Sequence, residues 1–397
     1  MHLARRAWCR TYQTVFRIAL PILPYTEPLI LEHAEDVPAV LQKRSIQKVL
    51  IVTDPGIARL GLTAPLERAL TAQGIGVTVY AETRANPTVS NVEEAASLYR
   101  ESACQAIIGF GGGSVMDCAK GVGARIAQPN KPINKMRGLL RIHRRLPLLI
   151  AVPTTAGTGS EVTLAAVITD DETHYKYPIN DFVLIPRFAV HDPEFTRGLP
   201  ASITGQTGMD ALTHAIEGYT TKAAWEMTDM FHLKAIELIA RHLRGAVENT
   251  AEGREGMALA QYVAGMGFSN VGLGIVHSMA HGLGALYDTP HGVANAIILP
   301  VVMEYNAPYT GEKYREIARA MGVEGVDAMT QEEYRKAACD AVRKLGQDVG
   351  IPADLKAIVK DEDVQFLAES AFADACRPGN PRDTSVEEIA ALYRSMM

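Results

Sequence analysis

The first half of the chain alternates short apolar runs with stretches of helical spacing. The runs are KVLIVTD (48–54), GVTVYAET (76–83), QAIIGFGGGS (105–114), PLLIAVPTTAG (147–157), AVITD (166–170) and FAVHDP (188–193). Segments 61–74 and 91–102 lie between the first runs and have the length of helices that connect parallel strands. Runs that are apolar almost throughout are typical of a sheet covered on both faces. This pattern therefore predicts an α/β domain over residues 1–197, with 1–40 as an N-terminal helix or hairpin segment.

The second half has a different pattern, because the strand-like runs stop. After Leu199 the chain is rich in Ala, Leu, Met, Glu and Lys, for example over 225–248 and 252–268, and this composition favours helices. The change falls at DPEFTRGLP (192–200), where two prolines and a glycine interrupt the pattern. A chain of 397 residues also exceeds what one hydrophobic core usually supports. We expect residues 198–397 to form a separate all-helical domain.

The amino-acid composition excludes some classes of binding partner. The chain is 47% hydrophobic and 21% charged, as in ordinary globular proteins, and its formal net charge is −6. An acidic balance argues against nucleic acid or an anionic membrane surface as a partner, since phosphate groups attract basic patches. The cysteines are widely spread, odd in number and form no CxxC pair, which favours a reducing compartment, and we expect the cytoplasm. They are Cys9, Cys104, Cys118, Cys339 and Cys376.

The N-terminal segment MHLARRAWCRTYQTVFRIALPIL carries four arginines and no acidic residue. This composition resembles a transit peptide. However, Arg17 interrupts its apolar run, which is too short to span a bilayer. We expect an amphipathic helix that packs on the protein.

Two loops are candidates for binding phosphate. In GFGGGSVMDCAK (109–120), three glycines permit close backbone approach, and Ser114 with Asp117 resembles a capping box that opens a helix. A helix N-terminus offers free N–H groups to an anion. The second loop, PTTAGTGSEVT (153–163), is rich in hydroxyls. Either loop alone could be a tight turn that bonds its own backbone, but two such loops after successive strands favour a ligand site at the carboxyl ends of the strands.

The helical half contains a candidate metal site. Asp210 and His214 are four residues apart, as are His277 and His281, and His291 follows a proline turn. Residues at this spacing share a helical face. Spacing does not decide which of the last three histidines bind a metal, and a mixed nitrogen and oxygen set suits zinc or ferrous iron equally. The other histidines lack such partners, and we interpret them as structural or surface residues. They are His2, His33, His143, His174, His191, His232 and His242.

Four motifs together are similar to the iron-containing, group III alcohol dehydrogenases. They are GGGSVMDCAK, PTTAGTGSEVT, DALTHAIEGY and GIVHSMAHGLGALYDTPHG, in the order and spacing of that family. The resemblance covers residues 40 to 395. It implies a dinucleotide-binding α/β domain, an all-helical metal-binding domain, and a nicotinamide that meets a metal-bound alcohol between them.

The resemblance also implies roles for individual residues. The metal ligands would be Asp210, His214, His277 and His291, and His281 would relay protons. The cofactor residues would be Asp54, Asn86, Gly112, Gly113, Ser114, Asp117, Thr154, Thr155, Thr158 and Lys176. Asp54 would pair with the adenosine ribose and repel a 2′-phosphate, which favours NAD over NADP. The metal would be Fe2+, with Zn2+ as the alternative. We expect Ala165, Phe268 and Tyr287 to line a pocket for a small or medium primary alcohol or aldehyde.

Other functions share the same two-domain plan. Glycerol dehydrogenases, hydroxyacid–oxoacid transhydrogenases and dehydroquinate synthases resemble it, but a cyclising lyase needs Lys and Arg around the metal, and the ligand-bearing segments contain none. A non-catalytic assembly protein that kept the fold is a further alternative. For an enzyme we expect a homodimer or higher homo-oligomer, with no nucleic acid or membrane partner.

Overall fold

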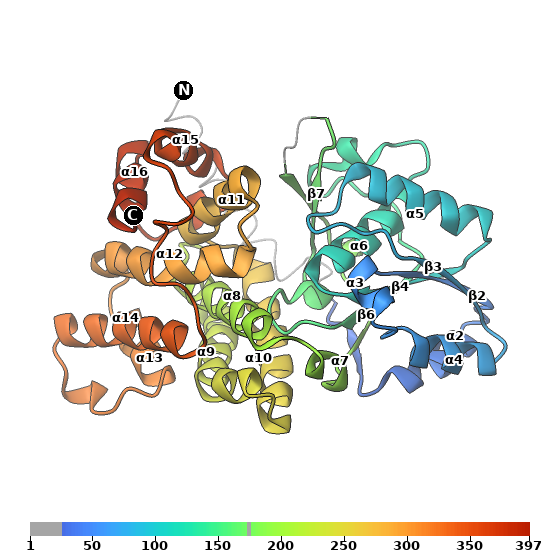
Figure 1. Cartoon of the computed structure of the whole chain (residues 1–397), viewed down its shortest axis with the longest axis horizontal. Helices are drawn as coiled ribbons and strands as arrows, with labels where there is room; N and C mark the ends of the chain where they lie inside the picture. Colours follow the sequence, from blue (N-terminus) through green and yellow to red (C-terminus); the bar gives the residue numbers. More distant parts are fainter. Residues whose placement is uncertain (1–25, 173–175) are drawn as a thin grey trace. The chain divides into compact units, whose positions relative to one another are not determined.

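The computed structural model describes residues 26–172 and 176–397 (Figure 1). The described chain divides into two compact units, one that ends at Gly198 and one from Leu199 to Met397. The predicted N-terminal amphipathic helix lies outside the described residues.

The first unit is built on a six-stranded sheet in which every strand pairing is parallel. The strands, in spatial order, are β1 (Leu29–Leu31), β9 (Phe188–Val190), β6 (Leu148–Pro153), β4 (Ala106–Gly111), β2 (Lys48–Val52) and β3 (Gly76–Tyr80). The chain runs from β2 to β3 on one side and then to β4 on the other side of β2, so the direction of winding reverses between β2 and β4. Open α/β sheets bind ligands at such a reversal, outside the carboxyl ends of the strands.

Alternate side chains of each strand enter two separate cores. In β2, Val49 and Ile51 belong to one apolar cluster, and Leu50 and Val52 belong to the other. Figure 1 shows α5 and α6 on one face of the sheet and α2 and α4 on the opposite face. These helices are α2 (Val37–Gln42), α4 (Ala64–Ala72), α5 (Val89–Glu101) and α6 (Gly113–Ala127). The predicted α/β class, with a sheet covered on both faces, is confirmed.

The apolar run at 166–170 does not join this sheet. It forms β7 (Ala165–Thr169), which pairs antiparallel with β8 (Lys176–Asn180), and β5 (Gly138–Leu139) completes a three-stranded sheet. Burial alternates along β7 and β8, so one face of each strand is buried and the other is partly exposed. No strand was predicted at β8, whose sequence, KYPIN, contains a lysine and a proline.

The second unit is helical, as predicted. Its helices are α8 (Ala201–Thr220), α9 (Glu226–Val247), α10 (Ala251–Val271), α11 (Ile275–Tyr287), α12 (His291–Asn306), α13 (Lys313–Ala320), α14 (Gln331–Asp348), α15 (Val364–Ala373) and α16 (Val386–Ser395). His232 of α9 is fully buried between Gly218 and Gly267, where a Cβ atom would lie 2.2 and 2.4 Å from its Nε2. Burial lowers the pKa of His232 to about 3, so this ring is neutral and acts in packing.

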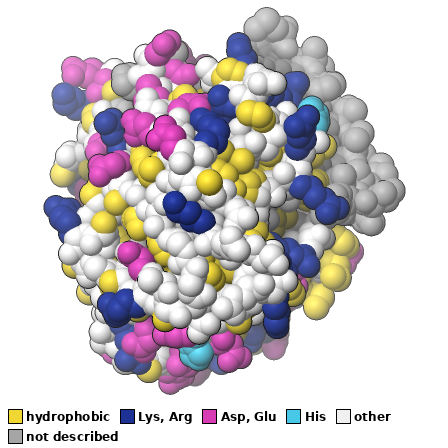
Figure 2. Space-filling model, turned by 90° about the vertical axis from the view of Figure 1, so that its right-hand side faces the viewer, with side chains coloured by type: hydrophobic (Ala, Val, Ile, Leu, Met, Phe, Trp, Pro, Cys, Tyr) yellow, Lys and Arg dark blue, Asp and Glu magenta, His cyan; other side chains and the backbone are white. Residues whose placement is uncertain are grey.

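In the described part of the chain, no single helix has both the length and the apolar composition needed to cross a membrane. Helices α10 and α11 satisfy these conditions only when taken together, and they meet at an angle of 103°. On the face that Figure 2 displays, Lys and Arg side chains are interspersed with acidic and apolar ones.

Candidate functional site

Three of the four predicted metal ligands meet inside the helical unit. Asp210 comes from α8, His277 from α11, and His291 is the first residue of α12, directly after Pro290. The Oδ1 atom of Asp210 lies 3.9 Å from Nε2 of His277 and 3.6 Å from Nε2 of His291. Donors bound tetrahedrally at about 2.1 Å lie about 3.4 Å apart, so a small contraction of this three-donor cluster would enclose an ion.

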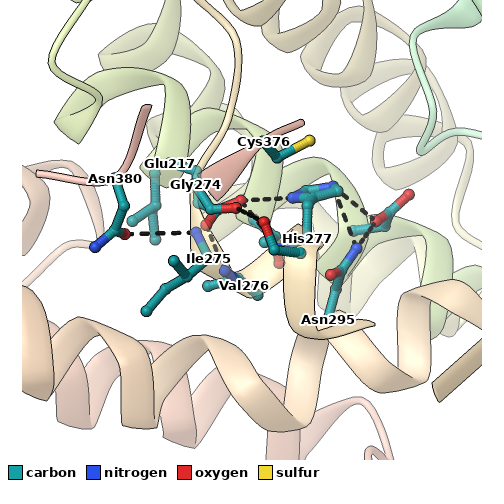
Figure 3. Close-up of polar contacts among 12 residues, drawn as sticks. Glu217, Gly274, Ile275, Val276, His277, Asn295, Cys376 and Asn380 are labelled. Carbon is teal, nitrogen blue, oxygen red and sulfur yellow. Dashed lines mark hydrogen bonds and ion pairs between the residues drawn. The ribbon is translucent and has the colours of Figure 1, made fainter. Parts of the chain in front are cut away.

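The amide of Asn295, which Figure 3 shows beside His277, lies at the point on which the three-donor cluster converges. Nδ2 of Asn295 lies 2.6 Å from Oδ1 of Asp210, 3.0 Å from Nε2 of His291 and 3.3 Å from Nε2 of His277. An amide nitrogen carries two hydrogens and cannot satisfy three acceptors. A divalent cation contacts all of them at once, so the donors present fit such an ion. Asn295 was not predicted, although it lies one helical turn after His291.

The charge of Asp210 also favours a divalent cation at this point. Burial raises its pKa, but the nearby histidines and the Asn295 hydrogen bond outweigh this effect and lower the pKa below its usual value. Asp210 is therefore a buried carboxylate, which needs a positive partner. One carboxylate oxygen with imidazole nitrogens suits ferrous iron or zinc.

A second carboxylate sets the protonation of the cluster. Oε2 of Glu217 lies 2.6 Å from Nδ1 of His277, and Oε1 accepts the backbone N–H of Val276 at 2.7 Å (Figure 3). Burial raises the pKa of Glu217 to about 7, and burial holds the pKa of His277 well below its usual value. A neutral imidazole that donates its Nδ1 proton to Glu217 presents a free lone pair at Nε2. Glu217 was not predicted, although it lies on α8 seven residues after Asp210.

The fourth predicted ligand, His214, lies beside the cluster. Its ring stacks on His277 with centroids 4.6 Å apart and on Phe268 with centroids 4.3 Å apart. Its Nδ1 atom is buried without a hydrogen-bond partner among the described residues. A buried imidazole nitrogen without a partner is unfavourable, and coordination or an added water would satisfy it. Phe268, predicted for the substrate pocket, thus contacts a candidate ligand.

His281 faces a different neighbour from His277. Its Nδ1 lies 2.9 Å from Oδ2 of Asp374, which follows α15, and its ring stacks on His291 with centroids 5.5 Å apart. Burial raises the pKa of Asp374, but the hydrogen bonds from His281, Cys376 and Ser278 together with the charge interaction with His281 outweigh this effect, and the pKa is about 2. An ionised Asp374 can only accept, so Nδ1 of His281 carries a proton and donates it to this carboxylate. The third predicted pocket residue, Tyr287, instead donates its hydroxyl to Oδ2 of Asp363 at 2.5 Å.

In the first unit, the glycine turn after β4 opens α6. Gly112 is the N-cap residue, so the predicted capping box of Ser114 and Asp117 is wrong: both residues lie inside the helix. The carboxylate of Asp117 is partly buried and accepts the Ser160 hydroxyl at 2.9 Å and the Val167 N–H at 3.0 Å. Burial raises the pKa of Asp117. Its observed contacts therefore hold the second hydroxyl-rich loop against α6.

The predicted loop threonines pack against these glycines. A Cβ atom on Gly113 would lie 2.7 Å from Cγ2 of Thr158, and one on Gly112 would lie 3.3 Å from Cγ2 of Thr155. The backbone N–H of Thr154 bonds to the carbonyl of Gly111 at 3.0 Å. Glycine is thus required at 113 for the loop to approach the start of α6.

Two further predicted cofactor residues contact each other. Lys176 Nζ donates to Oδ1 of Asn86 at 2.8 Å, and the backbone N–H of Asn86 donates to the Ser114 hydroxyl at 3.2 Å. Asn86 has a left-handed backbone, with φ of 58°. These contacts bring the segment after β3 to the first turn of α6.

The remaining predicted cofactor residue, Asp54, follows β2. Its Oδ1 atom caps helix α3 (Pro55–Arg59) by accepting the N–H groups of Gly56 at 2.7 Å and Ile57 at 2.9 Å. Asp54 and the glycine turn after β4 therefore follow the two strands between which the winding reverses, where Oδ2 of Asp54 can accept a further donor.

A buried lysine that was not predicted supports the second loop. Nζ of Lys120 donates to Ser160 Oγ at 3.0 Å, to the carbonyl of Thr163 at 2.9 Å and to the carbonyl of Ala165 at 2.8 Å. Burial lowers the pKa of Lys120 to about 8. Ala165, predicted for the substrate pocket, is thus held to α6 through its backbone.

Comparison with known proteins identifies relatives of the whole chain. The family profile described as iron-containing alcohol dehydrogenase matches residues 31–193, and the profile for the C-terminal part of that family matches residues 204–397. Lactaldehyde reductase of Escherichia coli K12 is 47% identical over 357 residues, which cover 89% of this chain and 93% of the relative.

Solved structures agree with these matches. The crystal structure of a 1,3-propanediol oxidoreductase aligns with a TM-score of 0.91 at 39% identity, covering 94% of this chain and 99% of that one. Sulfoacetaldehyde reductase of Bifidobacterium kashiwanohense, solved in complex with NAD+, aligns with a TM-score of 0.83 at 28% identity, covering 94% and 98%. The two profiles span most of the sequence, and this chain therefore belongs to the iron-containing alcohol dehydrogenase family of oxidoreductases.

Proposed function

We propose that this protein is a metal-dependent, NAD(H)-linked alcohol dehydrogenase or aldehyde reductase for small to medium primary alcohols and aldehydes. The observation that carries the proposal is the convergence of the three-donor cluster on one point, where Asn295 Nδ2 contacts all three donor atoms. Relatives named for lactaldehyde and 1,3-propanediol support the substrate class, and the neighbour solved with NAD+ supports the cofactor.

In the helical unit, some residues would bind the metal and others would orient a ligand or transfer a proton. Asp210, His214, His277 and His291 would hold Fe2+, or Zn2+ as the alternative. A divalent ion held there would supply Lewis acidity towards the oxygen of the substrate. Glu217 keeps Nε2 of His277 unprotonated for coordination. Asp374 keeps the His281 proton on Nδ1, so Nε2 of His281 can accept the hydroxyl proton and pass it outward.

The residues of the first unit would bind the dinucleotide. The free N–H groups at the start of α6 suit its phosphates, and Thr154, Thr155 and Thr158 supply further polar groups beside them. Asp54 would accept a ribose hydroxyl through Oδ2, and its charge disfavours the 2′-phosphate of NADP. Asn86 and Lys176 would complete the site, and the same proposal places the enzyme in the cytoplasm as a homo-oligomer.

A direct assay tests this function. We expect metal-free protein, reloaded with Fe2+ or Zn2+ under anaerobic conditions, to oxidise NADH in the presence of small aldehydes and to use NADPH less well. Absorbance of the reduced nicotinamide measures the rate. Inactivity towards every aldehyde, together with no NADH binding in a fluorescence titration, would support the assembly-protein alternative. Exchange between a hydroxyacid and an oxoacid without free nicotinamide would support a transhydrogenase.

Substitutions separate the ligands from the proton relay. Asp210→Ala and His277→Ala should lose bound metal, because each removes a donor atom from the cluster. His281→Ala should keep the metal and lose most of its turnover, about 10²-fold or more, as expected when a general acid or base is removed. Metal content by mass spectrometry and kcat are measured on the same samples. Loss of metal in His281→Ala with retention in His291→Ala would mean that the ligand assignment is wrong.

Glu217 contacts the proposed ligand His277 but is not itself a proposed ligand. Changing Glu217 should therefore lower the affinity for the metal without removing a donor atom. Glu217→Gln should weaken metal binding by about 10- to 100-fold, as is typical when the partner of a ligating histidine is changed. The exposed Glu255 of α10 provides the matched control, Glu255→Gln. Competition with a chelator measures both dissociation constants, and equal values in the two variants would contradict the role of Glu217.

The close approach at Gly113 predicts a specific loss of cofactor binding. In Gly113→Ala the added methyl group would collide with Thr158 and displace the loop, which should weaken NADH binding by about tenfold if the usual cost of overpacking, about 1–3 kcal/mol, falls on the bound state. Gly346→Ala is the control, since its Cβ would meet no atom closer than 3.5 Å. Fluorescence titration measures the dissociation constants. Unchanged affinity in Gly113→Ala would place the dinucleotide elsewhere.

A further inference from the structure

A second group of ligand atoms lies beside the first but shares none of its residues. His281 of α11 meets Asp374 and Cys376, which lie in the turn after α15, and one ligand atom from each lies within 4.8 Å of the other two. We call these residues the sulfur cluster. Within the described parts of the chain, Cys376 is the one cysteine in any such group, since Cys104, Cys118 and Cys339 are buried elsewhere.

The sulfur cluster is held in place by its surroundings. Oδ1 of Asp374 accepts the Ser278 hydroxyl at 3.2 Å and the backbone N–H of Cys376 at 2.8 Å, while Oδ2 faces Nδ1 of His281 at 2.9 Å. The carboxylate is therefore oriented before any ion arrives. None of the three residues is fully buried, and the side chains of His281 and Asp374 are 36% and 20% exposed, so an ion can reach the cluster from solvent.

The donor types differ between the two groups, and this difference determines which ion each one favours. The three-donor cluster offers nitrogen and oxygen only, whereas the sulfur cluster offers one sulfur, one nitrogen and one oxygen. Thiolate ligands favour zinc and similar soft or borderline ions over magnesium, calcium or manganese. Three protein ligands with one position left for water also match common zinc coordination.

We propose that His281, Asp374 and Cys376 form a second cation site, selective for zinc-like ions, whose occupancy inhibits the enzyme. Binding forms a bond from the ion to the Cys376 sulfur, and the thiol proton leaves to solvent. The ion also takes the lone pair of Nδ1, so Nε2 is the ring nitrogen of His281 that carries a proton while the ion is bound. Nε2 then cannot accept a proton from the reaction. The inhibition rests on the proposed function, in which His281 relays that proton, whereas the binding of the ion does not.

Cobalt reports on the sulfur bond directly, because a Co2+–thiolate bond gives a near-ultraviolet charge-transfer band that nitrogen and oxygen ligands do not give. We expect metal-free full-length protein, titrated with Co2+ without oxygen or added thiols, to bind two equivalents and to develop this band. Cys376→Ser should lose the band and bind one equivalent. The matched control, Cys104→Ser, should keep both.

Two outcomes would overturn the site. One is a wild-type protein that shows no charge-transfer band at two equivalents of Co2+, a measurement that needs no variant. The other is a band that persists in Cys376→Ser.

The inhibitory role has its own readout in the iron-loaded enzyme. Added Zn2+ should lower the rate of wild-type protein at concentrations that leave Cys376→Ser at least tenfold less inhibited, each relative to its own rate without zinc. Equal inhibition of both proteins would overturn the inhibitory role. A protein inactive on all aldehydes would instead refute the proposed function, and the cobalt band would still decide whether the second site exists.

Discussion

A carboxylate buried among imidazole rings is the constraint on which the helical unit depends. Asp210 is 3% exposed, and an unpaired charge at that depth would destabilise the fold by several kcal/mol. The imidazole rings around it and the hydrogen bond from Asn295 relieve the charge only in part. Helices α8, α11 and α12 must therefore meet where a cation can complete the pairing.

Glycines make that meeting possible. A Cβ atom on Gly292 would lie 2.3 Å from the backbone carbonyl oxygen of Gln206 on α8, and one on Gly274 would lie 2.7 Å from Oε1 of Glu217. The start of α12 can therefore approach α8 closely enough for His291 to face Asp210. The start of α11 likewise approaches Glu217 closely enough for its first N–H groups to bond to that carboxylate. Small residues at two helix starts thus bring donor atoms from three helices into one cluster.

Periodicity was sufficient to predict an α/β part followed by a helical part, but not the contacts between helices. His277 and His281 have the same helical spacing, yet Glu217 faces one and Asp374 faces the other, and Asp374 lies 93 residues after His281. Contacts at such a distance in sequence leave no periodic signal. The capping box at Ser114 failed for a related reason: Asp117 bonds to a loop more than forty residues away instead of to its own helix end.

The chemistry of the Cys376 thiol explains how the three-donor cluster and the sulfur cluster can lie side by side and still select different ions. Burial raises the pKa of Cys376 well above its usual value, so the thiol stays protonated and is a poor ligand until a cation displaces the proton. The three-donor cluster contains no thiol, so an ion that binds there displaces no thiol proton. Ferrous iron and zinc therefore both bind at the three-donor cluster at a lower free-energy cost than at the sulfur cluster. Only an ion whose affinity for sulfur exceeds the cost of removing the thiol proton is held at Cys376.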